Sequence, residues 1–167
     1  VKKGDQTAIA GAGQVTMGES TVLKARARKV RRLAGGKVVC GFAGAVADCQ
    51  ALLERLEAKI DGTGGHLRRG AVEFAKEWRT DRMLRQLNAM IVAADAECLL
   101  LVSGDGNVIE PDDGLAAVGS GGPFALSAAR ALLKHTDLGA EQIAREALVI
   151  AADVCVFTNH EIVLETL

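Results

Sequence analysis

The order of strand-like and helix-like segments is the feature that most restricts how this 167-residue chain can fold. Runs rich in Val, Ile and Leu, typical of strands, come first and are followed by two segments with helical periodicity. Further strand-like runs, two more helical segments and a last strand complete the chain. A parallel βαβ fold would alternate strand and helix, so this order predicts an α+β fold. We expect a four-layer αββα sandwich, in which two antiparallel sheets are flanked on the outside by helix pairs.

The expected elements form one domain over residues 1–167, because no repeat, low-complexity segment or linker interrupts them. A hairpin turn is expected at 103–107, where Asp-Gly and Gly-Asn tolerate positive φ. Helices are expected over 43–60 and 67–87, from Pro123 onward and from Ala140 onward. The strand-like runs are 7–10, 38–42, 89–94, 97–102, 108–110, 115–118 and 161–166.

Composition excludes several classes of function. Hydrophobic residues make up 49% and charged residues 25% of the chain, and the net charge is −1, as in ordinary soluble proteins. Aromatic residues make up only 3% and tyrosine is absent, so stacking platforms for single-stranded nucleic acid cannot be built. The sequence shows neither a membrane span nor a secretory signal, which predicts a cytoplasmic protein without a membrane partner. The four cysteines form no C-x-x-C pair and are expected to be buried free thiols.

Three glycine-rich clusters, at 10–14, 41–44 and 119–123, each follow a strand-like run. Glycines before a helix leave backbone N–H groups unpaired, and such groups suit a phosphate or the oxyanion of an acyl-transfer intermediate. None of the clusters matches a phosphate-binding motif. The alternative is purely structural, since glycine also permits tight turns and close packing of sheets.

A basic run at 24–32 holds six cations in nine residues. Its period of two would place Lys24, Arg26 and Arg28 on one solvated face of a strand and Lys29 on the opposite face. A lysine that faces a small-residue interior is a candidate catalytic group, because burial lowers its pKa and its charge can stabilise an alkoxide. The alternative, a nucleic-acid patch, is disfavoured by the near-neutral charge of the whole chain.

Several of these segments together resemble the HslV (ClpQ) family, the peptidase subunit of the bacterial HslUV protease. The resemblance runs in order along essentially the whole chain, and the segments 78–81 and 119–122 are specific to that family. The matching segments are 10–16, 28–31, 41–44, 75–81, 110–111, 119–123 and 158–159.

The resemblance implies an N-terminal-nucleophile hydrolase fold and an assembly of two stacked six-membered rings. It also implies an ATPase ring partner, HslU, which uses ATP and feeds unfolded protein substrates into the chamber. In that family an N-terminal threonine attacks the peptide bond while its own α-amine takes the proton. By resemblance, Lys29 is the catalytic lysine, Gly41 supplies an oxyanion-hole amide and Ser120 bonds near the threonine amine. The backbone carbonyls of Ala152, Cys155 and Thr158 match a site for a monovalent cation such as Na⁺.

Two departures from the family affect the chemistry. The family sequence begins with a Thr-Thr pair about five residues before the position of Val1, so the printed chain lacks the nucleophile and is expected to be inactive. Thr7 is the first hydroxyl residue and has no free amine. Ala12 stands where the family has an aspartate that pairs with the lysine, and its loss should lower the pKa of Lys29. Either the natural protein is an active threonine peptidase of which this chain is a truncated or disabled form, or it is a catalytically inactive ring scaffold or regulatory subunit.

Overall fold

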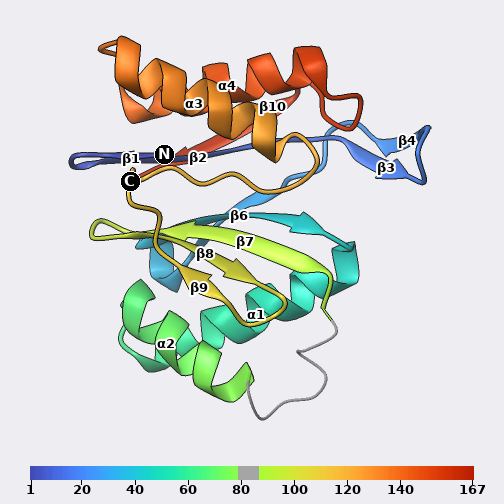
Figure 1. The fold of residues 1–167 in the computed structure, drawn as a ribbon. Coiled ribbons are helices and arrows are strands. Elements are labelled where there is room, and N and C mark those ends of the chain that lie inside the picture. Colours follow the sequence, from blue (N-terminus) through green and yellow to red (C-terminus); the bar gives the residue numbers. More distant parts are fainter. Residues whose placement is uncertain (79–86) are drawn as a thin grey trace.

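The computed structural model describes residues 1–78 and 87–167, and it forms four layers (Figure 1). Helices α3 (Gly122–His135) and α4 (Ala140–Val154) cover one sheet, and helices α1 (Val46–Gly62) and α2 (Leu67–Trp78) cover the other. The two sheets face each other between these helix pairs. The predicted αββα sandwich is therefore confirmed.

The sheet beside α1 and α2 has five antiparallel strands in the order β5-β6-β7-β8-β9. The turn between β8 and β9 is the predicted hairpin, in which the amide of Ser103 donates to the carbonyl of Asn107 over 3.0 Å and Gly106 has a φ of +87°. The strands are β5 (Val30–Leu33), β6 (Val38–Gly44), β7 (Ala89–Ala94), β8 (Leu99–Ser103) and β9 (Val108–Ile109), and the 3-10 turn η1 (Ala34–Gly36) joins β5 to β6.

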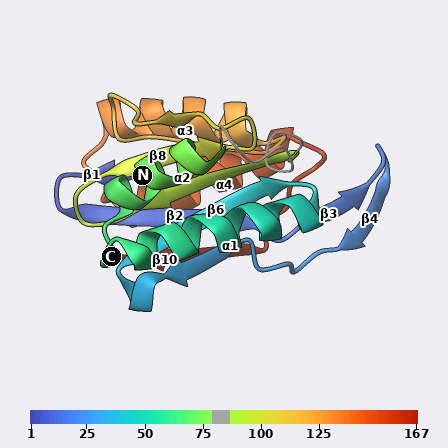
Figure 2. The ribbon, with the colours of Figure 1, turned by 90° about the horizontal axis from the view of Figure 1, so that it is seen from below.

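The sheet beside α3 and α4 is smaller. Strand β2 (Gln6–Ala12) lies in its centre, between β1 (Lys2–Lys3) and β10 (Ile162–Thr166). Strands β3 (Val15–Met17) and β4 (Thr21–Lys24) pair only with each other, and their hairpin projects from the body of the molecule (Figure 2). Three exposed apolar side chains lie on this hairpin, namely Met17, Val22 and Leu23.

Three buried clusters hold the layers together. The first lies between α1, α2 and the five-stranded sheet and is built from large side chains such as Leu56 and Phe74. The second lies under α3 and α4 and consists mainly of alanine, with Leu115 and Ile143 among the few larger members. The third joins the two sheets and contains Ile9, Val30, Val39, Val92, Ala94 and Leu99.

Two predicted strands are wrong. Residues 115–118 form no strand, although Leu115 is buried, because this segment fills the core beneath α3 as an irregular connection. The basic run does not continue as a strand through 25–28, because β4 ends at Lys24 and the chain then crosses close to Gly13. A single ladder-like bond remains there, from the amide of Ala27 to the carbonyl of Gly13 over 2.8 Å.

The helix predicted over 67–87 is observed over the part of it that the structure describes, except at its last residue. Helix α2 extends to Trp78, residues 79–86 lie outside the described part of the chain, and Leu87 is not helical. All four cysteines are buried and free, as predicted. None of the helices within 1–78 and 87–167 is long and apolar enough to span a membrane.

Candidate active site

Residues that are far apart in the sequence line one cavity of about 150 Å³ between the two sheets and helices α3 and α4. Val1, Lys29, Gly41 and Ser120 all contribute to its wall, together with Thr158 from the turn after α4. The three groups that the sequence selected, Lys29, Gly41 and Ser120, thus lie around the amino end of the described chain. Alanines of the core under α3 and α4 form much of the remaining wall, and their small size leaves the space open.

Lys29 lies at the end of the irregular segment that leads into β5. Its ammonium donates to the backbone carbonyl of Gln14 over 2.5 Å, and its own carbonyl accepts from the amide of Phe42 over 3.1 Å. Burial lowers the pKa of Lys29, and the neighbouring Cys49 thiol offsets this in part. A cation that loses hydration and gains only a neutral carbonyl is a strong electrostatic partner for developing negative charge.

The carboxylate that the family resemblance would place at position 12 is replaced by the buried methyl group of Ala12. Among the residues that the structure describes, Lys29 makes no salt bridge. Gln14 helps to orient Lys29 in place of that carboxylate, because its backbone carbonyl accepts from the Lys29 ammonium. Gln14 is itself anchored, since its buried side chain donates to the carbonyl of Val156 over 2.8 Å. Sequence reasoning did not single out Gln14. The available signal was its place at the end of the first glycine-rich cluster, within the segment 10–16 that resembles the family.

Strand register decides which backbone amides of the second glycine cluster face the candidate site. Gly41 lies opposite Val92 in β7, and because the amide of Phe42 bonds toward β5, the amide of Gly41 faces β7. Gly44 lies opposite Ala89 in β7. The amide of the next residue, Ala45, donates to the carbonyl of Asn88 and so faces β7. Because amides alternate along a strand, the amide of Gly44 faces away from β7. Among the described residues, the amide of this cluster that no strand pairing uses is therefore that of Gly44, which has a φ of +134° and which sequence reasoning did not select.

Gly41 also has a steric role, which does not depend on the direction of its amide. A Cβ atom at this position would lie 3.0 Å from Cγ2 of Ile9 on the opposing sheet. Glycine therefore lets the two sheets approach each other next to Lys29.

Ser120 lies in the loop that enters α3. Gly119 has a φ of +90° and accepts a hydrogen bond from the amide of Gly122 over 2.9 Å, which turns the loop toward β6. A Cβ at Gly119 would lie 3.1 Å from Cβ of Ala43, so the loop rests directly on the second glycine cluster. The Ser120 side chain is exposed and forms no hydrogen bond with the described residues, which leaves its hydroxyl available to a ligand.

Val1 is held at one edge of the three-stranded sheet. Its amino group donates to the carbonyl of Ala8 over 2.9 Å, and its carbonyl accepts from the amide of Ala8 at the same distance. Because strand groups alternate, the amides and carbonyls of Ala10 and Ala12 face the same edge, which continues past Val1 toward Lys29.

A larger cleft of about 690 Å³ adjoins the cavity and shares Lys29 and Ser120 with it. Its floor is apolar, with Phe42, Cys49 and Leu53, and its rim is basic. The rim residues are Lys24, Arg28 and Arg31. A cleft with an apolar floor, a free backbone edge and a polar corner suits an extended peptide.

The proposed cation ligands lie at the carboxyl end of α4. Ala152 belongs to the last turn of the helix, while Cys155 and Thr158 follow it, and the amide of Thr158 donates to the carbonyl of Cys155 over 3.2 Å. Helix carboxyl ends carry partial negative charge, and carbonyl oxygens suit hard cations. Within the described ranges, no group of three or more His, Cys, Asp or Glu side chains could hold a metal, so only backbone carbonyls come into question here.

The fold and the cavity define a class of protein. Two antiparallel sheets between helix pairs, with a lysine and free hydrogen-bond donors at the amino end of the chain, form the sandwich of the N-terminal-nucleophile hydrolases. The proteasome subunit family matches residues 1–167, and the chain belongs to this family.

Within that family the chain is an HslV-type subunit. The crystal structure of eukaryotic HslV from Trypanosoma brucei shares 50% sequence identity and a TM-score of 0.92 with it, over 99% of this chain and 95% of that one. BPH from Thiobacillus denitrificans, solved alone and in complex with epoxomicin, is 20% and 21% identical with TM-scores of 0.73 and 0.74. In both cases the match covers 100% of this chain and 95% of the other. This more distant likeness shows the fold alone. The chain is thus related to the proteolytic subunits of protease assemblies whose family activity is that of threonine peptidases.

Proposed function

We propose that this protein is the peptidase subunit of a two-component, ATP-dependent protease that cuts unfolded polypeptides inside a ring chamber. Its nucleophile is an N-terminal threonine of the natural chain, about five residues before Val1. The subunits assemble as a double hexameric ring in the cytoplasm, and an HslU-type ATPase ring supplies unfolded substrate. The observation that carries the proposal is that Val1, Lys29 and Ser120 line a single cavity.

The free edge of β2 supports this position of the nucleophile. The antiparallel register pairs Lys2 of β1 with Thr7 of β2 and Lys3 with Gln6, so each step toward the amino end of β1 faces one residue further along β2. A segment that continued β1 toward its amino end would therefore place about the fourth residue before Val1 opposite Ala12. The next residue would reach the cavity wall formed by Lys29.

Each group then has a chemical task. The α-amine of the threonine takes the proton of its hydroxyl, and the hydroxyl oxygen attacks the peptide carbonyl carbon. The positive charge of Lys29 stabilises the attacking oxygen, and the amide of Gly44 donates to the carbonyl oxygen as it becomes negative. The tetrahedral intermediate collapses, the leaving amine takes the proton from the α-amine, and water hydrolyses the ester that remains. Ser120 orients the α-amine by a hydrogen bond.

A monovalent cation such as Na⁺ fits the carbonyl oxygens of Ala152, Cys155 and Thr158. When bound, it would fix the turn after α4 by electrostatic attraction. Thr158 also lies against the loop of Ser120, since a Cβ at Gly121 would lie 3.3 Å from its Cγ2. These residues therefore link the cation site to the position of Ser120.

The second candidate function is a catalytically inactive ring scaffold or regulatory subunit of the same assembly. Ala12 is the observation that favours it, because it removes the carboxylate that would orient Lys29. The active function is supported better, because the hydroxyl of Ser120 has no hydrogen-bond partner within 1–78 and 87–167, and Lys29 retains an acceptor in the carbonyl of Gln14.

The test uses the full natural chain, with its encoded amino-terminal residues, and a short chromogenic peptide, assayed with and without the ATPase. We expect turnover, and we expect Lys29→Met to lower kcat by about 100-fold or more, because it removes the charge that stabilises the reacting oxygen. Lys37→Met is the matched control, since Lys37 is exposed and lines neither cavity nor cleft. Absence of turnover by the full chain in both conditions would reject the enzyme and leave the scaffold function.

A further inference from the structure

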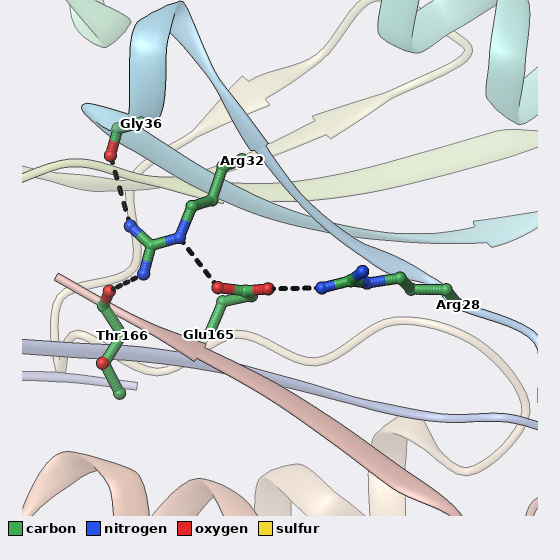
Figure 3. A network of polar contacts seen from close by, with 5 residues as sticks. All are labelled: Arg28, Arg32, Gly36, Glu165 and Thr166. Atoms are coloured by element: carbon green, nitrogen blue, oxygen red, sulfur yellow. Dashed lines mark hydrogen bonds and ion pairs between the residues drawn. The ribbon is translucent and has the colours of Figure 1, made fainter.

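A half-buried carboxylate joins β10 to the segment that carries Lys29 (Figure 3). Glu165 of β10 accepts from Arg28 over 2.9 Å through one oxygen and from Arg32 over 2.8 Å through the other. Its side chain is only 16% exposed, although both arginines are considerably more exposed. Arg32 also donates to the carbonyl of Thr166 over 2.6 Å, which anchors it to β10 a second time.

The two arginines flank Lys29 in sequence. Arg28 precedes it in the irregular segment, and Arg32 follows it in β5, so the chain is tied to the same carboxylate on both sides of Lys29. The amide of Phe42 in β6 donates to the backbone carbonyl of Lys29, which ties the lysine to the five-stranded sheet as well. The peptide that carries the lysine is therefore fixed between β10 and β6.

The position of the Lys29 backbone matters because few polar contacts hold its side chain. The ammonium ends a flexible four-carbon stem, and its hydrogen bond to Gln14 is its one polar contact within the described residues. Ala12 provides no carboxylate to orient it. The position of the Lys29 Cα limits the region that the ammonium can reach through the staggered rotamers of the side chain.

We infer that Glu165 is a positioning residue, which holds Arg28 and Arg32 and thereby keeps the Lys29 ammonium directed into the cavity. The catalytic consequence rests on the proposed function, but the position of Lys29 does not. The pKa of Glu165 is lowered by its hydrogen bonds to Arg32 and Arg28, so the carboxylate is charged at neutral pH.

The chain contains a matched control pair. Glu161, just before β10, binds Arg26 over 3.1 Å, with side chains that are 50% and 80% exposed. This ion pair connects the same two segments but involves only one arginine, which lies on one side of Lys29 and is not adjacent to it as Arg28 is. Exposed ion pairs of this kind contribute little to stability, so Glu161→Gln should leave the site unchanged.

The experiment compares crystal structures and peptidase kinetics of the full natural chain with those of its Glu165→Gln and Glu161→Gln variants. The amide of Gln has nearly the shape of the carboxylate, but an NH2 group replaces one of the two oxygens, so one of the arginines faces a donor where Glu165 offers an acceptor. We expect Glu165→Gln to move the Lys29 ammonium out of hydrogen-bond distance of the Gln14 carbonyl. We also expect a fall in kcat of about tenfold to 100-fold with KM unchanged, since misplaced groups lose catalysis rather than binding.

Arg28→Gln serves as a second variant, because it releases one arginine and leaves Glu165 with Arg32. Its effect on kcat should be smaller than that of Glu165→Gln. If Lys29 keeps its place in both variants, or if Glu161→Gln displaces it equally, the inference is overturned. If Lys29 moves but the unaltered full chain shows no turnover, positioning by Glu165 stands and the proposed function fails.

Discussion

The two halves of the sandwich are built from side chains of different size. Under α1 and α2 the core consists of large residues, and its members Leu52, Leu56 and Phe74 are fully buried. Under α3 and α4 most buried residues are alanines, including Ala147 and Ala151. Both halves have one sheet and two antiparallel helices, so the difference lies in the side chains rather than in the architecture.

This difference separates stability from function within one domain. Large side chains bury more apolar area per residue, so the α1 and α2 half supplies most of the hydrophobic stabilisation. Alanines allow close approach of helix and sheet, and in this protein they also line the cavity that Lys29 and Ser120 share. The half with small side chains thus provides the space for chemistry, and the other half keeps the sheets together.

The largest effect should come from truncation in the large-residue half. Phe74→Ala removes a fully buried ring that packs between α2 and the five-stranded sheet, and it should lower the free energy of unfolding by about 3–5 kcal/mol. Urea denaturation followed by circular dichroism measures this loss. Val72→Ala on the same helix is the control, because Val72 is exposed and its truncation should cost little. A cost for Phe74→Ala no greater than that of the control would contradict the assignment of stability to this half.

An intermediate effect should come from enlargement in the alanine half. Ala151 is fully buried, and its Cβ would lie 3.7 Å from a Cβ at Gly121, so Leu at this position would press on the loop of Ser120. Ala151→Leu should lower the free energy of unfolding by about 1–3 kcal/mol through overpacking. It should also reduce peptidase activity of the full chain. Ala58→Leu, on the exposed face of α1, provides the comparison and should change neither quantity appreciably.

The smallest effect concerns the boundary between the halves, where Lys29 lies. Burial lowers its pKa from the ordinary 10.5, so between the lowered value and 10.5 the unfolded chain binds more protons than the folded one. The free energy of unfolding must then rise with pH across this window. Denaturation of the natural chain and of Lys29→Met between neutral pH and pH 10.5 measures the difference. A stability difference between them that does not depend on pH would show that Lys29 titrates as an ordinary exposed lysine.

Much of this fold could be predicted from local sequence signals. The bounds of β7 were predicted correctly, and Pro123 marked the start of α3 to within one residue. The predictions failed where contacts with segments distant in sequence determine the conformation. Residues 115–118 have the composition of a strand but cover the alanine core without pairing. Residues 25–28 alternate like a strand but make a single ladder-like bond within the described ranges, to Gly13.

The candidate site shows the same division. Residue type and resemblance selected Lys29, Gly41 and Ser120, and their shared cavity accords with that selection. The roles of Gln14, Gly44 and Glu165 could not be predicted, because they depend on which atoms face the site. Strand register decides between the amides of Gly41 and Gly44, and a contact across more than 130 residues of sequence brings Glu165 to Arg28.

The amino-acid sequence by itself determined the class of fold, the family and the residue types that can perform acyl transfer. These follow from periodicity and from short motifs, which act within a few residues along the chain. Only the tertiary structure decided which backbone amide is free, what holds Lys29 in the absence of a carboxylate at position 12, and where the cavity lies. Those properties arise from distances between segments that are remote in sequence, and such distances are fixed only when the two sheets pack.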